Sequence, residues 1–309
     1  MNATVEKILV SGLINIETTL RVDSFPVNYN PVRYPFFGVN TTVSGVGYNI
    51  AKALTTLGDA VQLVSLIGQD PAGKLVREAL EETGIRQDLV VDQLAHTAQS
   101  VILYEQSGRR QIHVDLKDIQ EQTYPVDRLE QALRGCSLAV LCNINFSRPF
   151  LRLARQAGKP IASDVHAISS FDDDYNRDFM QAADILFMSD EQLPLPPEQW
   201  IRNLWNRYAA EIVVVSRGAK GALLGLRSSG SLEHLPAVYA RPVVNTIGAG
   251  DALFSSFIHG YLRSGNAYTA LRKAMVFAAY KIGEKGAAEG FLDETSLDEL
   301  SRQVHSGVA

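Results

Sequence analysis

The chain has 309 residues, which is long enough for one large α/β domain or two ordinary ones with a substantial core. A hydrophobic fraction of 46% with 20% charged residues excludes a disordered or fibrous chain. The formal net charge of -5 argues against a nucleic-acid partner, because phosphate neutralisation needs clustered Lys and Arg.

The first residues, MNATVEKILVSGL, lack the basic start and long apolar run of a signal peptide. Nowhere do 18 apolar residues follow one another, so we expect no membrane partner and a cytoplasmic location. Cys136 and Cys142 belong to an apolar run, CSLAVLC, and are interpreted as inert core thiols. No spacing of Cys and His indicates a zinc site.

Short β-branched runs alternate with segments of helical period along the chain. In chain order, the expected strands are 8–10, 61–66, 138–142, 161–163, 185–187 and 212–215, and the expected helices are 49–57, 71–82, 150–157 and 198–208. The strands are mostly apolar throughout, as in a sheet covered on both faces. The alternation predicts one α/β domain over residues 1–309, a three-layer α/β/α sandwich with a mostly parallel central sheet.

Two segments interrupt this alternation. Residues 13–44 contain three prolines among alternating apolar and polar residues, and residues 98–115 suggest two strands joined at Ser107 and Gly108. Arg109 and Arg110 are interpreted as part of that solvated turn. We expect both segments to form antiparallel strands outside the main sheet, as a small β-flap. The flap either closes on a substrate as a lid or is an edge extension without a moving part.

The stretch NTIGAGDALFSSF, residues 245–257, places small residues before an apolar run of helical period. Gly248, Ala249 and Gly250 are therefore predicted at a helix N-terminus, where unpaired amides and the helix dipole attract a phosphate. Asp251 is then either a general base for a hydroxyl group, beside amides that stabilise a transferring phosphoryl group, or a capping acid at a tight turn.

A second glycine-rich turn runs into a helix at SGVGYNIAKALTTLG, residues 44–58. Together with the 245–251 motif, it resembles the two signatures of the ribokinase-like (PfkB) carbohydrate kinase family. The segments 9–17, 64–85 and 212–224 also resemble family motifs in the same order, so the resemblance covers nearly the whole chain. It implies a ribokinase-like fold and ATP-dependent phosphorylation of a hydroxymethyl group on a sugar or sugar-containing compound.

The resemblance assigns roles to individual residues. Asp251 aligns with the catalytic base, and the amides of Gly248, Ala249 and Gly250 align with the anion hole. Glu17 replaces the usual Asp, and its extra methylene changes which hydroxyl groups it can pair with. The positions implied for the acceptor are Asn15, Glu17, Gly45, Gly47 and Asn49, and those implied for the nucleotide are Ser216, Gly218, Gly221 and Gly286.

Metal binding departs from the family pattern. The family's NxxE motif falls at residues 189–192, where both the Asn and the Glu are absent. Magnesium is expected with ATP, and Asp190 and Glu191 are the candidate ligands because Mg²⁺ often binds protein through waters. Asp164 follows a strand and is a candidate for contacting substrate or metal-bound water, whereas His166 is interpreted as a polar loop residue.

Potassium activation is not expected from this sequence. Asn245 and Ile247 stand where the family's DTTGAGD segment has Asp and Thr, so oxygen groups are missing from a position that some members use to bind a monovalent cation.

Two other functions remain open. A nucleoside kinase shares the fold, and Tyr34, Phe36 and Phe37 would either offer a flat apolar face to a base or form a homodimer interface through the flap. A non-catalytic sugar- or nucleotide-binding regulator is suggested by the altered NxxE segment and opposed by the intact Gly-Ala-Gly-Asp loop. Fold similarity does not identify the acceptor.

Overall fold

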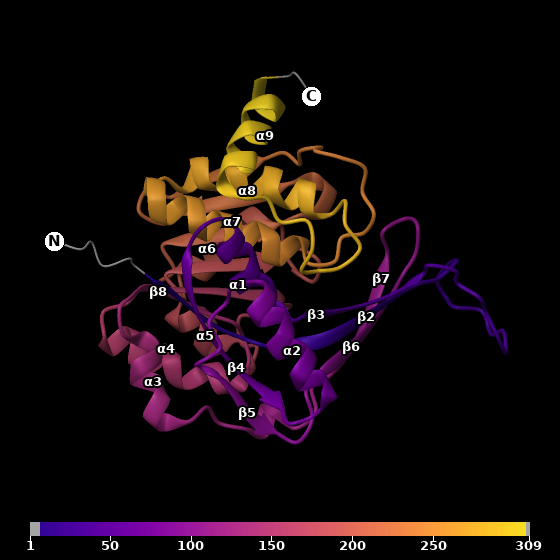
Figure 1. The fold of residues 1–309 in the computed structure, drawn as a ribbon. Coiled ribbons are helices and arrows are strands. Elements are labelled where there is room, and N and C mark those ends of the chain that lie inside the picture. Colours follow the sequence, from indigo (N-terminus) through magenta and orange to yellow (C-terminus); the bar gives the residue numbers. More distant parts are fainter. Residues whose placement is uncertain (1–6, 307–309) are drawn as a thin grey trace.

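A nine-stranded sheet runs through the computed structural model, which describes residues 7–306, and helices cover both faces of this sheet (Figure 1). Its strand order is β13-β12-β11-β10-β9-β8-β1-β4-β5. The strands of this sheet are β1 (Lys7–Ser11), β4 (Ala60–Gly68), β5 (Val90–Leu94), β8 (Cys136–Leu141), β9 (Ile161–Ala167), β10 (Ile185–Ser189), β11 (Ile212–Ser216), β12 (Ala222–Leu226) and β13 (Ser231–Leu235).

The two helical layers complete a three-layer α/β/α sandwich, which confirms the expected fold class. The helices are α1 (Val46–Thr56), α2 (Pro71–Glu82), α3 (Val126–Leu133), α4 (Arg148–Gln156), α5 (Arg177–Ala182), α6 (Pro197–Trp205), α7 (Ala249–Ser264), α8 (Ala267–Lys281) and α9 (Glu294–Ser306). All pairings from β5 to β11 are parallel, and only β12 and β13 are added in antiparallel fashion.

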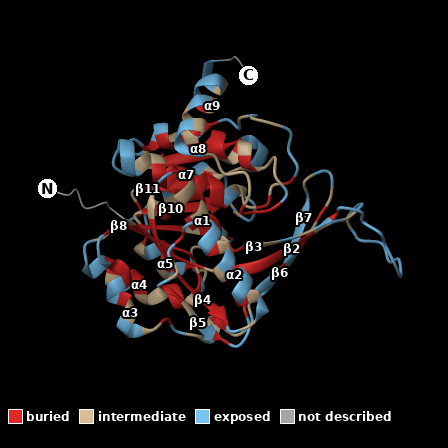
Figure 2. Cartoon of the chain, viewed as in Figure 1, coloured by how far each residue is buried: buried red, intermediate tan, exposed pale blue. Residues whose placement is uncertain are grey.

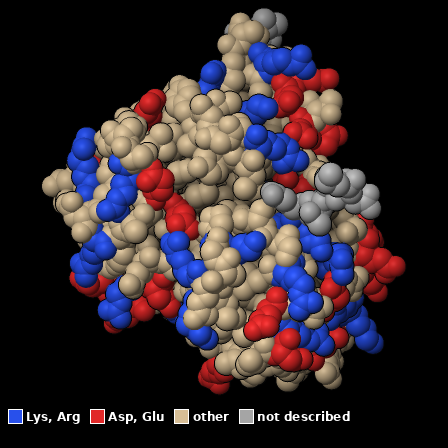
Figure 3. Space-filling model, turned by 90° about the vertical axis from the view of Figure 1, so that its left-hand side faces the viewer, with Lys and Arg blue, Asp and Glu red and all other residues tan. Residues whose placement is uncertain are grey.

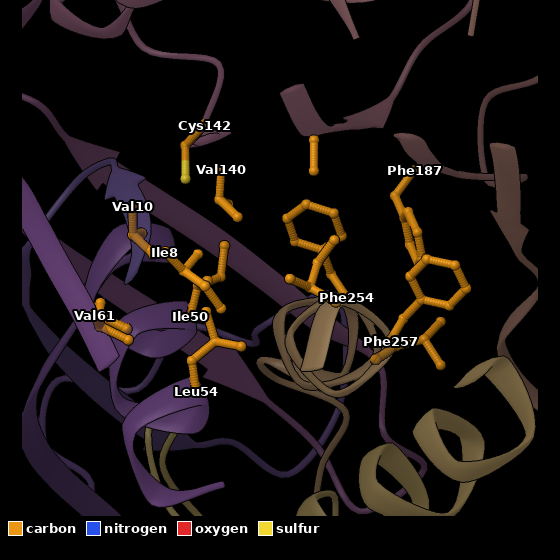
Figure 4. Packing of buried hydrophobic residues seen from close by; sticks show 14 of the residues in the cluster. Ile8, Val10, Ile50, Leu54, Val61, Val140, Cys142, Phe187, Phe254 and Phe257 are labelled. Carbon is orange, nitrogen blue, oxygen red and sulfur yellow. The ribbon is translucent and has the colours of Figure 1, made fainter. Parts of the chain in front are cut away.

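Strand β1 shows why the strands are apolar throughout. Successive side chains point to opposite faces, so Ile8 and Val10 join the cluster under α1 and α7 while Leu9 joins the cluster under α3 to α6. Figure 2 shows the central strands and the inner helix faces as buried. On the α7 side, Phe254 and Phe257 pack edge-on against Phe187, with ring centroids 4.9 and 5.1 Å apart (Figure 4).

Both cysteines are buried free thiols, as expected. Cys142 lies in the cluster shown in Figure 4, and Cys136 lies in the cluster on the opposite face of the sheet. Burial raises the pKa of Cys136 to about 11 and also raises the pKa of Cys142. The thiolate form that reacts is therefore disfavoured at both positions.

The β-flap is a separate four-stranded sheet that projects from one side of the molecule (Figure 1). Its strands lie in the order β3 (Val39–Ser44), β2 (Asn15–Arg21), β6 (Gln99–Tyr104) and β7 (Arg110–Asp115). The expectation of purely antiparallel strands was wrong, because β2 and β6 pair in parallel. The flap consists of two antiparallel pairs, β2 with β3 and β6 with β7. Strands β2 and β6 both leave the main body at the same end of the central sheet, so they run in the same direction where the two pairs meet.

The predicted elements are present with shifted ends. Helix 49–57 is observed as α1 and helix 198–208 as α6, which ends at Trp205. The elements that were not predicted from the sequence are β5, β12, β13, α3, α5, α8 (Ala267–Lys281) and α9. Strand β13 is a polar edge strand and α5 has only six residues, so neither shows a clear period.

Charged side chains of both signs lie next to one another on the face turned away from the β-flap (Figure 3). Arg155 pairs with Asp184 at 2.9 Å, and other arginines of the described residues pair similarly with nearby acids. None of the helices within residues 7–306 combines the length and hydropathy required for a bilayer crossing.

A buried ionic cluster ties α7 to the turn after α1 and to α9. The Asp59 carboxylate is 2.9 Å from His259 Nδ1 and 2.6 Å from Arg263 Nη1, and Glu294 lies 3.5 Å from His259 Nε2. Burial raises the pKa of Asp59, but the hydrogen bonds from His259 and Arg263 outweigh it and hold that pKa below its ordinary value.

We expect Asp59→Asn to lower the free energy of unfolding by about 1–3 kcal/mol, because a buried pair loses one partner. The pKa of Asp59 is depressed on folding, so its stabilisation is present above pH 3.8 and is lost as the pH falls through the folded-state pKa. Urea unfolding at pH 7 and at about pH 3 should therefore show that the free energy of unfolding falls less between these two pH values in the variant than in the wild type. The control, Asp88→Asn at an exposed pair with Arg86, should change stability by less than about 0.5 kcal/mol.

Candidate active site

The glycine loop, residues 245–250, turns directly into α7. Gly248 has φ 70°, a left-handed conformation, and a Cβ there would lie 2.6 Å from the carbonyl oxygen of Ala287. The amide of Ala252 makes the first bond of the helix, to the Gly248 carbonyl at 3.0 Å. The amides of Ala249, Gly250 and Asp251 therefore have no acceptor within this helix. The Ala249 amide donates to the Thr246 carbonyl at 3.3 Å, and those of Gly250 and Asp251 have no backbone acceptor, which is the geometry of an anion site.

A continuous set of hydrogen bonds connects Asp251 to the β-flap. Asn49 Nδ2 donates to Asp251 Oδ2 at 2.7 Å, and Asn49 Oδ1 is 3.2 Å from the hydroxyl of Ser44. That hydroxyl is also 3.0 Å from Glu17 Oε2, and Glu17 Oε1 accepts from the Ala287 amide at 3.3 Å. Four segments that are far apart in the sequence thus position one another, and all four side chains are buried.

Burial raises the pKa of the Asp251 carboxyl. The hydrogen bond from Asn49 and the charges of His166 and Lys281 act in the opposite direction and lower that pKa, while Asp164 raises it. Burial also raises the pKa of Glu17. A carboxylate that is desolvated but still hydrogen-bonded is a stronger proton acceptor than one in water.

Asp164 lies beside the glycine loop, in the middle of β9. The strand is longer than predicted and ends at Ala167, so Asp164 does not follow it and His166 is a strand residue rather than a loop residue. The Asp164 Oδ2 atom is 3.9 Å from the position that a Cβ on Gly250 would take. Its Oδ1 atom accepts from the amide of His166 at 2.8 Å, and His166 itself has φ 57°. The structure therefore brings Asp164 close to the anion site, and places the His166 ring 3.9 Å from the same carboxylate.

Asn15 and Glu17 face the body from β2, as the alternation of a strand requires. Asn15 Nδ2 donates to the hydroxyl of Ser100 at 3.1 Å, and Asn15 Oδ1 is buried with no hydrogen-bond partner within residues 7–306. Thr19, on the same face, has a buried hydroxyl that also lacks a partner in this part of the chain. Ser100 and Thr19 were not predicted from the sequence; their register on the flap is the signal that identifies them.

Gly45 and Gly47 allow close backbone contact. Gly45 has φ 102°, and a Cβ on Gly47 would lie 2.4 Å from the carbonyl carbon of Gly12. Both glycines thereby permit α1 to begin against the end of β1, which directs Asn49 toward Asp251.

The β-flap also contacts the glycine loop directly. Ile102, Ile247 and Ala287 form a small buried cluster, and Arg110 Nη1 donates to the Thr246 hydroxyl. The interpretation of Arg110 as a solvated turn residue was incomplete, because it lies in β7 and reaches across to the loop. This contact depends on the position of the flap, which sequence spacing does not reveal.

The residues expected at the nucleotide lie elsewhere along the same sheet edge. Ser216 ends β11, and its hydroxyl is 3.3 Å from the Met188 carbonyl. Gly218 and Gly221 follow with φ 53° and 94°, and a Cβ on Gly221 would lie 2.0 Å from the Leu235 carbonyl. Gly286, after α8, donates to Glu289 Oε2 at 2.9 Å.

The candidate metal ligands Asp190 and Glu191 contact residues other than Asp251. Asp190 is 3.7 Å from Arg217 Nε, and the Glu191 amide donates to the Ser189 hydroxyl at 3.2 Å. Within residues 7–306, no group of three or more His, Cys, Asp or Glu side chains has an arrangement that would hold a metal ion.

Residues 5–294 match the sequence profile described as pfkB family carbohydrate kinase. An ATP-dependent ribose-1-phosphate kinase from Halopiger xanaduensis is 28% identical over 287 residues, covering 91% of this chain and 93% of the relative. An acarbose 7(IV)-phosphotransferase from Actinoplanes sp. is 26% identical over 294 residues, covering 94% of this chain and 96% of the relative.

Solved structures share the fold over nearly the whole chain. The microbiome-derived acarbose kinase Mak1 superposes with a TM-score of 0.86 at 26% identity, covering 96% of this chain and 99% of that one. A nucleoside kinase from Burkholderia thailandensis in complex with inosine gives a TM-score of 0.80 at 18% identity, covering 97% and 99%. The second likeness concerns the fold alone.

We expect Asn49→Leu to raise the pKa of Asp251 further, because the variant loses the 2.7 Å hydrogen bond that stabilises the carboxylate while burial remains. Carboxyl ¹³C NMR of aspartate-labelled protein across a pH titration measures this shift. Asn143→Leu, which removes a comparable amide bond to Asn176, serves as the control and should leave the Asp251 signal unchanged. An unaltered titration of Asp251 in the Asn49 variant would contradict the assigned role of this hydrogen bond.

Proposed function

The chain belongs to the pfkB family of carbohydrate kinases, and from this premise we propose that it transfers the γ-phosphoryl group of ATP to a hydroxymethyl group of a sugar or sugar-containing small molecule. The observation that carries this proposal is the buried Asp251 in the first turn of α7, where the amides of Gly250 and Asp251, which have no backbone acceptor, meet a carboxylate with a raised pKa. Few structural roles require an acid at an anion site, whereas phosphoryl transfer from ATP to an alcohol requires both groups.

In this mechanism, the hydroxyl oxygen of the acceptor attacks the γ-phosphorus and the bond to the bridging oxygen of ADP breaks. The hydroxyl proton moves to Asp251, which must be ionised beforehand. Asn49 and Lys281 favour that ionised form, and burial makes the carboxylate more basic. The amides of Gly248, Ala249 and Gly250 stabilise the charge on the transferring group.

The acceptor is proposed to bind between the β-flap and the start of α1. Asn15, Glu17 and Asn49 present polar atoms there, with Gly45 and Gly47 shaping the backbone beside them. The unpartnered Asn15 Oδ1 supports this assignment, because a buried amide oxygen without a partner is costly unless a ligand hydroxyl group satisfies it. Glu17 accepts from Ala287 and Ser44, so its carboxylate is already oriented toward the same space.

The nucleotide is proposed to lie along the ends of β10 and β11. The residues assigned to it are Ser216, Gly218, Gly221 and Gly286. Magnesium bound with ATP would neutralise phosphate charge, and Asp164 beside the glycine loop fits a contact through metal-bound water. Asp190 and Glu191 fit less well, because Arg217 already neutralises Asp190.

Use of ATP and the two free thiols support a cytoplasmic location.

The flap arm, residues 22–38, favours a sugar over a nucleoside as acceptor. Tyr34, Phe36 and Phe37 lie in this arm, which projects away from the body (Figure 1). With a rise of about 3.3 Å per residue, strand β2 places the arm roughly 20 Å from Asn15. These rings therefore do not line the space next to Asp251, and a base would have to be recognised by other residues.

We expect Asp251→Asn to lower kcat by about a hundredfold or more with the acceptor that the wild type uses best, since the general base is lost. ADP release from ATP and Mg²⁺, coupled to an optical assay across a panel of sugars, sugar phosphates, oligosaccharides and nucleosides, identifies that acceptor. ATP affinity measured by calorimetry should change by less than about threefold in the variant.

Asp174→Asn, at an exposed position in the loop after β9, is the matched control and should retain wild-type turnover. Turnover that persists in Asp251→Asn would refute the general-base role. A wild type that binds ATP or a sugar without turnover of any acceptor would instead support a non-catalytic regulator, the alternative raised by the altered NxxE segment.

We also propose that the β-flap forms a homodimer interface. The flap arm exposes Tyr29, Phe36 and Phe37 by 92%, 78% and 95%, and the outer strands β3 and β7 are free edges within the described residues. Large exposed apolar side chains beside unpaired strand edges are typical of surfaces covered by a partner. A second copy of the chain presents the same surface, so a two-fold arrangement would cover both.

We expect the double variant Phe36→Ser/Phe37→Ser to weaken self-association by at least about tenfold, because both rings lose apolar burial. Sedimentation velocity over a concentration series measures the dimer dissociation constant. Val126→Ser, on the exposed surface of α3, removes a similar apolar group elsewhere and should have no effect. A wild type that sediments as a monomer at about 100 µM would exclude this dimer.

A further inference from the structure

Lys281, the last residue of α8, is an unusual group to find fully buried. Its exposed fraction is 0%, and its Nζ atom donates a hydrogen bond to the carbonyl oxygen of Ile247. Ile247 directly precedes Gly248, which begins the anion site. Because a buried ammonium group is costly unless charged or polar groups compensate it, its position at this loop requires an explanation beyond packing.

The ammonium group lies in the field of four acids that approach it from three sides. Asp251 belongs to α7, Glu17 belongs to the β-flap strand β2, and Glu284 and Glu289 follow α8. Burial lowers the pKa of Lys281 to about 8, and the charges of these four acids oppose that change. Lys281 in turn lowers the pKa of both Asp251 and Glu17, so its charge reaches the catalytic end of the site.

The carbonyl groups around this point already have protein donors. Asn245 Nδ2 donates to the carbonyl oxygens of Glu284 and Lys285 at 3.2 and 2.8 Å, and Lys281 donates to that of Ile247. Asn245 Oδ1 accepts from the Ile247 amide at 2.9 Å, which fixes the loop from its other side. Carbonyl oxygens that accept bonds from side-chain donors have less capacity to coordinate a metal cation.

We propose that Lys281 is a positioning residue that serves as a built-in monovalent cation: its ammonium group fixes the Ile247 carbonyl, so that the following amides point at the transferring phosphoryl group without any added alkali cation. This inference rests on the proposed kinase function and adds how the loop conformation at the anion site is maintained. The helix dipole favours the same arrangement, because Lys281 lies at the C-terminus of α8.

The first test uses the wild-type protein alone. Its kcat should agree within about twofold in KCl, NaCl and choline chloride at equal ionic strength, since choline is too large to replace a coordinated cation. Activation by potassium of tenfold or more over choline would overturn the proposal, whatever the variants do.

The second test compares Lys281→Met, which removes the charge at similar volume, with Lys281→Ala, which leaves space for a small cation. We expect Lys281→Met to lower kcat by about 10- to 100-fold while the KM for the acceptor changes by less than about threefold. Ammonium or potassium should restore Lys281→Ala by at least about fivefold, and choline should not. The wild-type kcat should fall above about pH 8 as Lys281 loses its proton, and that alkaline loss should be absent in Lys281→Met.

Lys273→Met is the matched control, because Lys273 lies on the same helix but pairs with Asp298 at the surface. It should leave kcat and its pH profile unchanged. A loss of kcat in Lys281→Met that neither cation restores in Lys281→Ala, with an unchanged pH profile, would reduce Lys281 to a packing role and overturn the proposal.

A binding measurement separates this inference from the proposed function. Calorimetry of ATP and ADP should show that Lys281→Met weakens ATP binding at least about fivefold more than ADP binding, because only ATP places a γ-phosphoryl group at the amides. If no acceptor turns over with the wild type, the kinase proposal fails, and this ATP-to-ADP difference still tests Lys281. Equal losses for both nucleotides would contradict the positioning role.

Discussion

The hydrogen bond between Asn49 and Asp251 is the contact on which the rest of the site depends, because it joins the first turns of two helices whose residues are 202 positions apart. Helices α1 and α7 pack side by side on one face of the sheet, where Phe254 and Phe257 fill the space above β10. That packing brings both N-termini to the same place. A carboxylate buried there is more basic because it is desolvated, and the hydrogen bond from Asn49 favours its ionised form.

Charge balance explains how an acid and an anion site can be neighbours. The amides at the start of α7 attract negative charge, while Asp251, Glu17 and Asp164 add negative charge of their own. Lys281 is the buried cation that offsets part of this excess from behind the loop.

The β-flap connects the proposed acceptor site to the glycine loop. Glu17 accepts from Ala287 across the interface, Arg110 donates to Thr246, and Ile102 packs on Ile247. A displacement of the flap would therefore change the surroundings of the glycine loop as well as the acceptor space. Through this coupling, closure of the flap would exclude water from the site before the phosphoryl group is transferred.

The sequence by itself determined the local features: apolar strands alternating with helices, the glycine turn before α7, and Asp251 in its first turn. These follow from side-chain period and from the conformational freedom of glycine, which act over a few residues. Only the tertiary structure decided that β2 and β6 pair in parallel, that Ser44 links Asn49 to Glu17, and that Lys281 reaches Ile247. Those contacts join residues far apart in the chain, so they depend on strand register and helix packing, which no short stretch of sequence specifies.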